Sequence, residues 1–160
     1  MAKKTYNEKL NHSGDLPKVG IITEPKKMAR YNATTMLIAA PLNYDALMKK
    51  VPMGKLTTID RMMAFLAKKY GADCTCPMTA GMFVNIAAHA SEERAGKDET
   101  PWWRVLKKNG LLNEKYPDGI EGQKVRLEAE GHTVVQKGQK YFVQGYEQKL
   151  WEITDYLHVS

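Results

Sequence analysis

The sequence is poor in cysteine and in clustered metal ligands. It has two cysteines, Cys74 and Cys76, separated by a single residue, which cannot form the disulfide framework of a small secreted protein. A zinc site needs four ligands, commonly in C-x2-C pairs, whereas the four histidines are scattered along the chain. We therefore expect no metal ion and no other cofactor. An enzyme with a nucleophilic Cys74 or Cys76 stays open as an alternative, although no partner base is evident.

Long apolar runs are also missing. No run reaches the ~18 residues of a membrane-spanning helix, and the first residues lack the apolar core of a signal peptide. We therefore expect a cytoplasmic protein that does not enter a membrane. The motifs of nucleotide-binding loops, zinc proteases and serine hydrolases are absent as well. Taken by themselves, the residues favour a binding module over an enzyme.

What the sequence does hold is a basic charge balance. The chain has 160 residues, of which 43% are hydrophobic, enough for a packed core, and its net charge is +6. Residues 1–30 contain seven Lys or Arg and three Asp or Glu, so they carry +4 of this charge. Glycine and proline interrupt residues 1–40, which predicts a loosely organised basic arm. A basic surface favours an anionic partner such as nucleic acid.

Two amphipathic helices follow the arm and a first short helix. Apolar residues recur at helical spacing over residues 59–70, after Thr57 and Thr58 and before Gly71, which are typical start and stop signals. A second apolar stripe begins after Pro77 and ends near residues 94–96. Two helices joined by a short turn predict a helix-turn-helix pair, whose second helix presents its polar face to a DNA groove.

The C-terminal third mixes short elements. Residues 123–130 predict a helix, and two alternating segments around Lys137 and Gly138 predict a β-hairpin with a basic tip, like the wing of a winged helix. Residues 147–157 predict a closing helix. The expected fold class is α/β, of the α+β type, with a helix-turn-helix and a small wing. We expect the arm to span residues 1–40 and the winged-helix-like domain to span residues 41–160.

Four segments resemble a known family in their order and spacing. They are residues 51–58 (VPMGKLTT), 101–105 (PWWRV), 116–120 (YPDGI) and 124–132, which end in EGH. They resemble the IPxGxVTT, PCHRV, Y-x-G-G-L and EGH segments of the DNA-binding domain of the alkylguanine-DNA alkyltransferases, the methylated-DNA–protein cysteine methyltransferase family. The resemblance covers roughly residues 43–133, and it implies DNA binding and a role in DNA repair.

The main departure from this family lies in the reactive segment. Trp102 stands where the family has its alkyl-acceptor cysteine, and Trp103 stands where it has the neighbouring histidine. An indole is neither a nucleophilic thiol nor a proton acceptor, so methyltransferase activity is not expected and the chain has no catalytic residue of this kind. Replacement of the cysteine by tryptophan is similar to the alkyltransferase-like proteins, which bind DNA that contains alkylated guanine without repairing it. In that case Trp102, Trp103 and Tyr116 would line an alkylguanine pocket.

Two further departures affect base flipping. Gly81 takes the place of the arginine that fills the gap left by a flipped base, and Ile59 takes the place of the tyrosine that acts on the target phosphate. Met78 or Met82 could instead serve as an apolar wedge. The predicted DNA contacts are Thr57, Thr58, Met78, Thr79, Gly81, Met82, Asn85, Arg104, Lys107 and Lys108.

The resemblance thus predicts a non-enzymatic, monomeric protein that binds double-stranded DNA and senses O-alkylated guanine. Nucleotide-excision repair proteins are the implied partners, and the implied location is the cytoplasm, associated with the nucleoid. The alternative is a winged-helix module that binds DNA or protein and has lost base flipping and lesion recognition.

Overall fold

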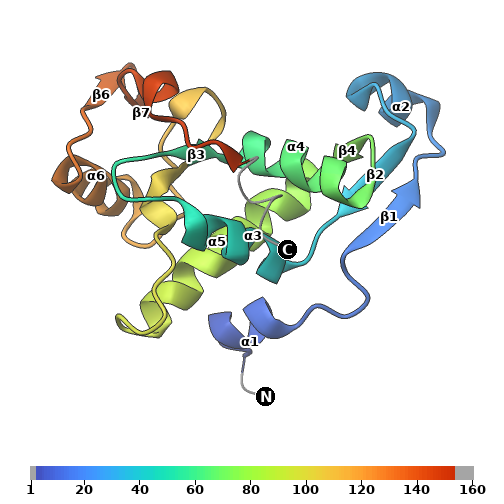
Figure 1. Cartoon of the computed structure of the whole chain (residues 1–160), viewed down its shortest axis with the longest axis horizontal. Coiled ribbons are helices and arrows are strands. Elements are labelled where there is room, and N and C mark those ends of the chain that lie inside the picture. The colour runs from blue at the N-terminus through green and yellow to red at the C-terminus, as the bar shows by residue number, and fades with distance from the viewer. Residues whose placement is uncertain (1–2, 154–160) are drawn as a thin grey trace.

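The structure is a computed structural model that describes residues 3–153. Helices surround one apolar core, and three small sheets lie at its edges (Figure 1). This arrangement confirms the predicted α+β class. Within residues 3–153, no helix is long and apolar enough to cross a membrane. The helices are α1 (Tyr6–Asn11), α2 (Pro25–Tyr31), α3 (Pro41–Lys50), α4 (Ile59–Tyr70), α5 (Pro77–Glu93) and α6 (Gly119–Ala129). The strands are β1 (Lys18–Ile21), β2 (Thr35–Ile38), β3 (Thr57–Thr58), β4 (Cys74–Thr75), β5 (Val105–Leu106), β6 (Val134–Lys137) and β7 (Lys140–Val143).

The predicted helix pair is present as α4 and α5. The Thr58 hydroxyl accepts a hydrogen bond from the backbone N–H of Arg61 and so caps the start of α4. Gly71 ends the helix in the left-handed conformation, with φ of 72°, which glycine adopts without steric cost. Pro77 occupies the first turn of α5, where its missing N–H has no intrahelical partner to lose. Local signals thus set three of the four ends of this pair.

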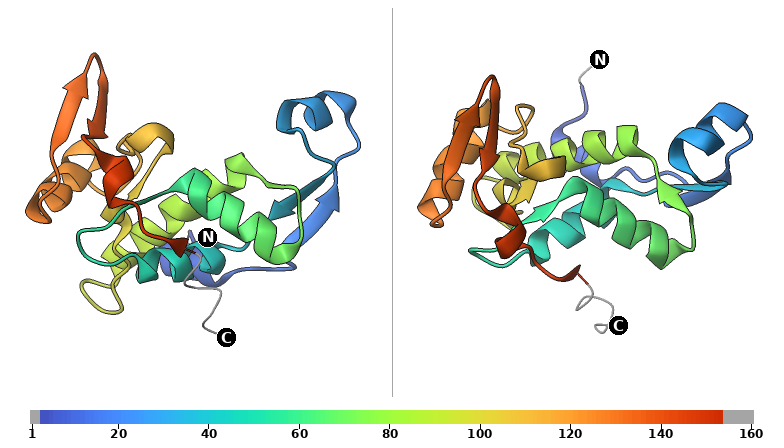
Figure 2. Two further views of the ribbon diagram at one scale, coloured as in Figure 1. Left: turned by 45° about the horizontal axis from the view of Figure 1, so that its top comes forward. Right: turned by 90° about the horizontal axis from the view of Figure 1, so that it is seen from above.

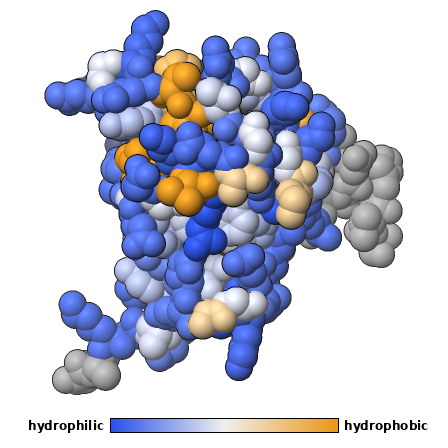
Figure 3. All heavy atoms as spheres, turned by 90° about the vertical axis from the view of Figure 1, so that its left-hand side faces the viewer, coloured by the Kyte–Doolittle hydropathy of each residue, from blue (hydrophilic) through white to orange (hydrophobic). Residues whose placement is uncertain are grey.

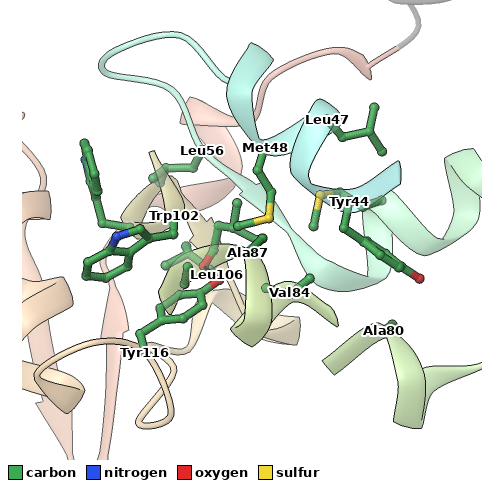
Figure 4. Close-up of a cluster of buried hydrophobic side chains, with 14 of the residues drawn as sticks. Tyr44, Leu47, Met48, Leu56, Ala80, Val84, Ala87, Trp102, Leu106 and Tyr116 are labelled. Carbon is green, nitrogen blue, oxygen red and sulfur yellow. Dashed lines mark hydrogen bonds between the residues drawn. The ribbon is translucent and has the colours of Figure 1, made fainter. Parts of the chain in front are cut away.

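The core lies between α3, α4 and α5. Small residues on the buried side of α5, such as Ala80 and Ala87, let the backbone of α5 approach α3, from which Tyr44 and Met48 project (Figure 4). Trp102 and Leu106 close the core on its other side. The centre of the fold is therefore the helix pair itself, supported by α3.

The segment that contains Trp102 is tied to the start of α4. Strand β5 pairs in parallel with β3, with Thr57 opposite Val105 and Thr58 opposite Leu106. A single 3-10 turn, Trp102–Arg104, precedes β5. The reactive-segment position and the N-terminus of α4 therefore lie side by side, although they are far apart in the sequence.

The predicted hairpin is present as β6 and β7, while the predicted closing helix is wrong in its described part. A short 3-10 helix, Tyr146–Lys149, is followed by extended chain, in which Leu150 pairs with Leu56. The backbone N–H of Leu56 donates to the Lys149 carbonyl, and that of Trp151 donates to the Leu56 carbonyl. These cross-chain bonds replace the bonds of a helix. Residues 154–157 of the predicted helix lie outside the described residues.

The end that carries α6 and the hairpin is largely hydrophilic, with a small apolar group (Figure 3).

Residues 3–40 form regular structure rather than the loose arm that the sequence predicted. Helix α1 packs on α5, where Glu93 accepts hydrogen bonds from the backbone N–H groups of Tyr6 and Asn7. Strands β1 and β2 are antiparallel, and β2 pairs in parallel with β4. Leu10 and Leu37 are buried in the main core. The division of the chain at residue 40 stays a prediction.

Candidate nucleic-acid interface

One face of α5 is exposed and carries apolar side chains. Met78 is 75% exposed and Met82 is 53% exposed, one turn further along the helix. Gly81 lies between them, and a Cβ atom placed on it would meet nothing within 4 Å. Thr79 uses its hydroxyl to bond to the Cys76 carbonyl within the first turn. Large exposed apolar side chains on a polar surface are typical of a contact site.

A groove of about 870 Å³ runs beside this face. Its walls come from α4, through Ile59, Met63 and Ala67, and from α5, through Pro77 and Gly81. Its volume lies in the range of small-molecule binding pockets, about 300–1,000 Å³. The groove therefore lies between the two helices of the pair, and its lining includes Ile59 and Gly81, two positions at which the sequence departs from the resemblance.

Cations border the groove. Lys107 and Lys108 lie at its edge, on the loop after β5, and Lys68 lies on α4. Lys107 approaches Glu114 at 3.4 Å, with both side chains well exposed, so this ion pair is weak and leaves the ammonium accessible. Asp60 and Asp73 are the acidic residues of the groove lining. Hydrogen bonds from the backbone and side chain of Thr34 lower the pKa of Asp73 and keep it charged. The groove thus has an apolar floor and a border in which cations outnumber acids.

Trp102, at the acceptor position, is a core residue. It is 1% exposed, and its ring contacts the Trp103 ring edge-on and the Tyr116 ring at 5.2 Å between centroids. Its indole N–H donates to Glu92 Oε1 at 3.1 Å. The Arg126 guanidinium lies 4.9 Å from the centroids of both Trp rings and also pairs with Glu92. All faces of the indole are therefore occupied by protein groups.

Trp103 is bonded to a largely buried carboxylate, Glu130. Its indole N–H donates to Glu130 Oε2 at 3.0 Å, and Arg104 pairs with the same carboxylate at 2.7 Å. Burial by itself would raise the pKa of Glu130, but the hydrogen bonds from Arg104 and Trp103 outweigh it and lower the pKa. The Arg104 guanidinium also donates to the Val51 carbonyl at 2.8 Å. This cluster therefore favours the ionised form of the Glu130 carboxylate.

Two buried polar side chains fix the backbone around these rings. The Gln123 amide donates to the carbonyls of Trp103 and Val105, and its oxygen accepts from the backbone N–H of Asn113. The Tyr116 hydroxyl donates to the Val105 carbonyl at 2.9 Å. Burial raises the pKa of Tyr116 far above its usual value, so the hydroxyl stays a donor. Buried hydrogen bonds thus hold the backbone of this segment around the two indoles.

The fold that carries this site is found among solved structures. The alkyltransferase-like protein of S. pombe in complex with DNA matches with a TM-score of 0.51 and 18% identity, over 70% of this chain and 94% of that one. S. pombe Atl1 in complex with damaged DNA that contains O6-carboxymethylguanine matches with a TM-score of 0.47 and 24% identity, over 69% and 91% of the two chains. The chain has the alkyltransferase-like fold. No protein-family model and no curated protein matches it.

On this alkyltransferase-like fold, the predicted DNA contacts separate into three groups. Met78, Thr79, Gly81 and Met82 lie on or beside the exposed face of α5, and Lys107 and Lys108 border the groove. Asn85 lies further along α5, half-buried, and accepts a hydrogen bond from Asn113. The remaining three residues are directed inward: Thr57, Thr58 and Arg104.

For these three residues burial disfavours a DNA contact, and their assignment stays a prediction. The side chains of Thr57 and Thr58 are buried, because β3 pairs with β5 and Thr58 caps α4. Arg104 has a side chain that is only 11% exposed, and its nitrogens bond to Glu130 and to the Val51 carbonyl. All three guanidinium nitrogens thus have a protein acceptor, which favours a structural role over a phosphate contact.

The predicted pocket residues do lie together, but they face one another. Trp102, Trp103 and Tyr116 form one buried aromatic cluster, in which the rings of Trp102 and Tyr116 lie close together (Figure 4). None of the three lines the groove. A pocket between them would require a ring to leave the core. Their assignment to an alkylguanine pocket stays a prediction, whereas the groove offers open space already.

Sequence reasoning missed the groups that surround this cluster and one wall of the groove. Glu92 and Arg126 belong to different helices, and only their pairing over Trp102 reveals their role. Tyr31, which lines the groove, comes from α2. No local pattern signals either contact, because each depends on segments that only the fold brings together.

Proposed function

We propose that this protein binds duplex DNA through the exposed face of α5 and the adjoining groove, without transferring an alkyl group. The observation that carries the proposal is the groove itself. It combines an apolar floor, a border with Lys68, Lys107 and Lys108, and the second helix of a helix-turn-helix pair. The fold is that of an S. pombe protein solved in complex with DNA, which supports the same partner here.

The chemistry of the border suits a phosphate backbone. Lysine ammonium groups neutralise phosphates and release condensed counterions, which makes binding strongly dependent on salt. Met78 and Met82 project from the exposed face of α5 and can contact sugars or bases as apolar groups. Phosphate contacts and apolar contacts thus come from neighbouring elements, as a nucleic-acid interface requires.

A non-catalytic role follows from the groups present at the reactive segment. Both indole N–H groups are donors that already bond to Glu92 and Glu130, so neither Trp102 nor Trp103 supplies a nucleophile or a base. Cys74 donates its thiol to the Thr35 carbonyl, and burial raises the pKa of this thiol, which disfavours the reactive thiolate. These observations support binding over thiol chemistry.

Recognition of modified guanine is the second candidate, and one observation favours it. Ile59 and Gly81 leave the groove open where the alkyltransferase family has a tyrosine and an arginine, so an extruded base with a substituent would find room there. The neighbour bound to DNA containing O6-carboxymethylguanine gives this candidate its lesion class. Nucleotide-excision repair proteins would then be the partners that act on the marked site.

A binding titration tests both candidates. Matched duplexes with and without one O6-alkylated guanine are titrated at two salt concentrations, with the wild type and with Lys107→Ala/Lys108→Ala. We expect the double variant to bind both duplexes more weakly and to lower the salt slope by about 0.9 for each phosphate that it no longer neutralises. Lys3→Ala/Lys4→Ala is the matched control, because it removes the same charge from exposed positions before α1. An equal loss in both variants would contradict the proposed surface, and equal affinity for both duplexes would exclude lesion sensing.

A further inference from the structure

The turn between α4 and α5 is clamped to the N-terminal segment. Strand β4 lies in this turn and pairs with β2, and the backbone N–H of Cys76 extends the pairing to the Leu37 carbonyl. On the other side of the turn, Asp73 accepts hydrogen bonds from the backbone and hydroxyl of Thr34 at 3.0 and 2.9 Å. The segment that holds α2 is therefore attached directly to the helix pair.

This attachment brings α2 to one end of the groove. Tyr31, the last residue of α2, lines the groove together with residues of α4 and β4, while Lys107 and Lys108 lie on the loop after β5. Figures 1 and 2 show that the β1–β2 segment with α2 and the β6–β7 hairpin project at opposite ends of the molecule, on the same side of α4. Helix α4, whose residues line the groove, lies between the two projections (Figure 2).

The exposed side of α2 is cationic. Lys26, Lys27 and Arg30 are all exposed on this short helix. Lys27 approaches Glu24 at 3.4 Å, but both side chains are more than half exposed, so the pair is weak in water. The Arg30 guanidinium lies 5.6 Å from the centroid of the Tyr31 ring, so this charge lies beside a residue that lines the groove. Three cations thus stand on a projection that is fixed beside the groove.

We infer that α2 is a second contact to the DNA backbone, which binds phosphates beyond those reached by Lys107 and Lys108. The inference rests on the proposed function, because the duplex must lie along the groove. Lys26, Lys27 and Arg30 then neutralise phosphates at one end of the bound stretch. The strand pairing of β2 with β4 positions these cations before binding, so little ordering of the backbone opposes the contact.

The experiment compares two triple variants of equal charge change. Lys26→Ala/Lys27→Ala/Arg30→Ala removes the α2 cations. Lys3→Ala/Lys4→Ala/Lys9→Ala removes three cations from around α1, which lies on the opposite side of the molecule from α4 and α2 (Figure 1). Affinity for a plain duplex is measured over a range of salt concentrations, and footprinting maps the protected stretch. Substitution is preferred to deletion of residues 1–30, because deletion would also remove α1 and β1 from the fold.

We expect the α2 variant to lower the salt slope by about 0.9 for each phosphate left without its cation and to shorten the footprint at one end. The α1 variant should keep the slope and the footprint of the wild type. If both triple variants behave alike while Lys107→Ala/Lys108→Ala still weakens binding, the α2 contact is wrong and the proposed function stands. If the wild type itself does not bind the duplex, both the α2 contact and the proposed function are overturned.

Discussion

The aromatic cluster at the reactive-segment position and the groove beside α5 differ in almost every physical property. The cluster is dry, with Trp102 1% exposed and its N–H bonded to Glu92. The groove is open, with an apolar floor, and Gly81 leaves space where a longer side chain would fit. The first region has the hydrogen bonds and packing of a core, whereas the second has the open, apolar lining of a surface groove. The comparison teaches that the position of a family's reactive segment can serve core packing while a neighbouring surface stays open.

The largest effect is expected from putting a thiol back at the acceptor position. Trp102→Cys should lower the free energy of unfolding by about 3–5 kcal/mol, because it removes a fully buried ring. We also expect no alkyl transfer from labelled alkylguanine DNA, since Trp103 offers an N–H donor and no base. Chemical unfolding and a labelling assay measure the two effects.

Val125→Cys is the control for this variant, because Val125 is 55% exposed on α6. It should change the free energy of unfolding by less than about 0.5 kcal/mol. Covalent label on the thiol introduced at position 102, at a level above this control, would show that the cluster has kept its reactivity.

The next effect concerns the carboxylate under Trp103. Glu130→Ala should lower the free energy of unfolding by about 3–5 kcal/mol, because it leaves the Arg104 guanidinium buried without its partner. Glu128→Ala, at an exposed position on α6, is the matched control and should cost less than about 0.5 kcal/mol. Urea unfolding of the two variants gives the comparison. Equal, small losses would mean that water already screens the Arg104–Glu130 pair.

The helix pair and the hairpin could be predicted from the sequence because their signals are local. Thr58, Gly71 and Pro77 set helix ends within a few residues of themselves. The predictions of a loose arm and of a closing helix were wrong, because strand pairing between residues far apart in the sequence determines the structure of both segments. Leu150 has apolar neighbours at helical spacing, but its strand-like pairing with Leu56 prevails. The candidate site divides in the same way: the exposed face of α5 follows from periodicity, whereas the inward orientation of Arg104 depends on Glu130, which lies 26 residues away.

A smaller effect, again at a buried residue, should appear as a pH dependence of the free energy of unfolding. His132 is buried, with its Nε2 atom lacking a hydrogen-bond partner among the described residues, and burial lowers its pKa below 6.5. Below about pH 6.5, His132 takes up a proton in the unfolded chain more readily than in the folded protein, so the free energy of unfolding falls as the pH falls. Above that pH both states are neutral and the effect vanishes.

Urea unfolding at pH 7.5 and pH 5.5 measures this dependence. The wild type should lose more stability between the two pH values than His132→Gln, which has no titrating group at this position. Glu130, whose pKa is lowered, stays ionised in the folded protein over this interval and contributes little to the difference. Equal losses in the two proteins would assign the acid sensitivity to other groups.

The smallest and most specific effect concerns the open region, at Gly81. Glycine inside a helix costs about 1 kcal/mol relative to alanine, and a Cβ at this position meets nothing within 4 Å, so Gly81→Ala should stabilise the protein by up to that amount. Gly81→Arg should stabilise it almost as much and should also bind duplex DNA more tightly, with a salt slope steeper by about 0.9. The alanine variant separates the two contributions, because it gains the helix propensity without the charge. Thermal unfolding and duplex titrations at several salt concentrations measure them. If the arginine variant binds DNA no better than the alanine variant, this end of α5 does not face the duplex. That result would contradict the proposal that the groove beside it binds DNA.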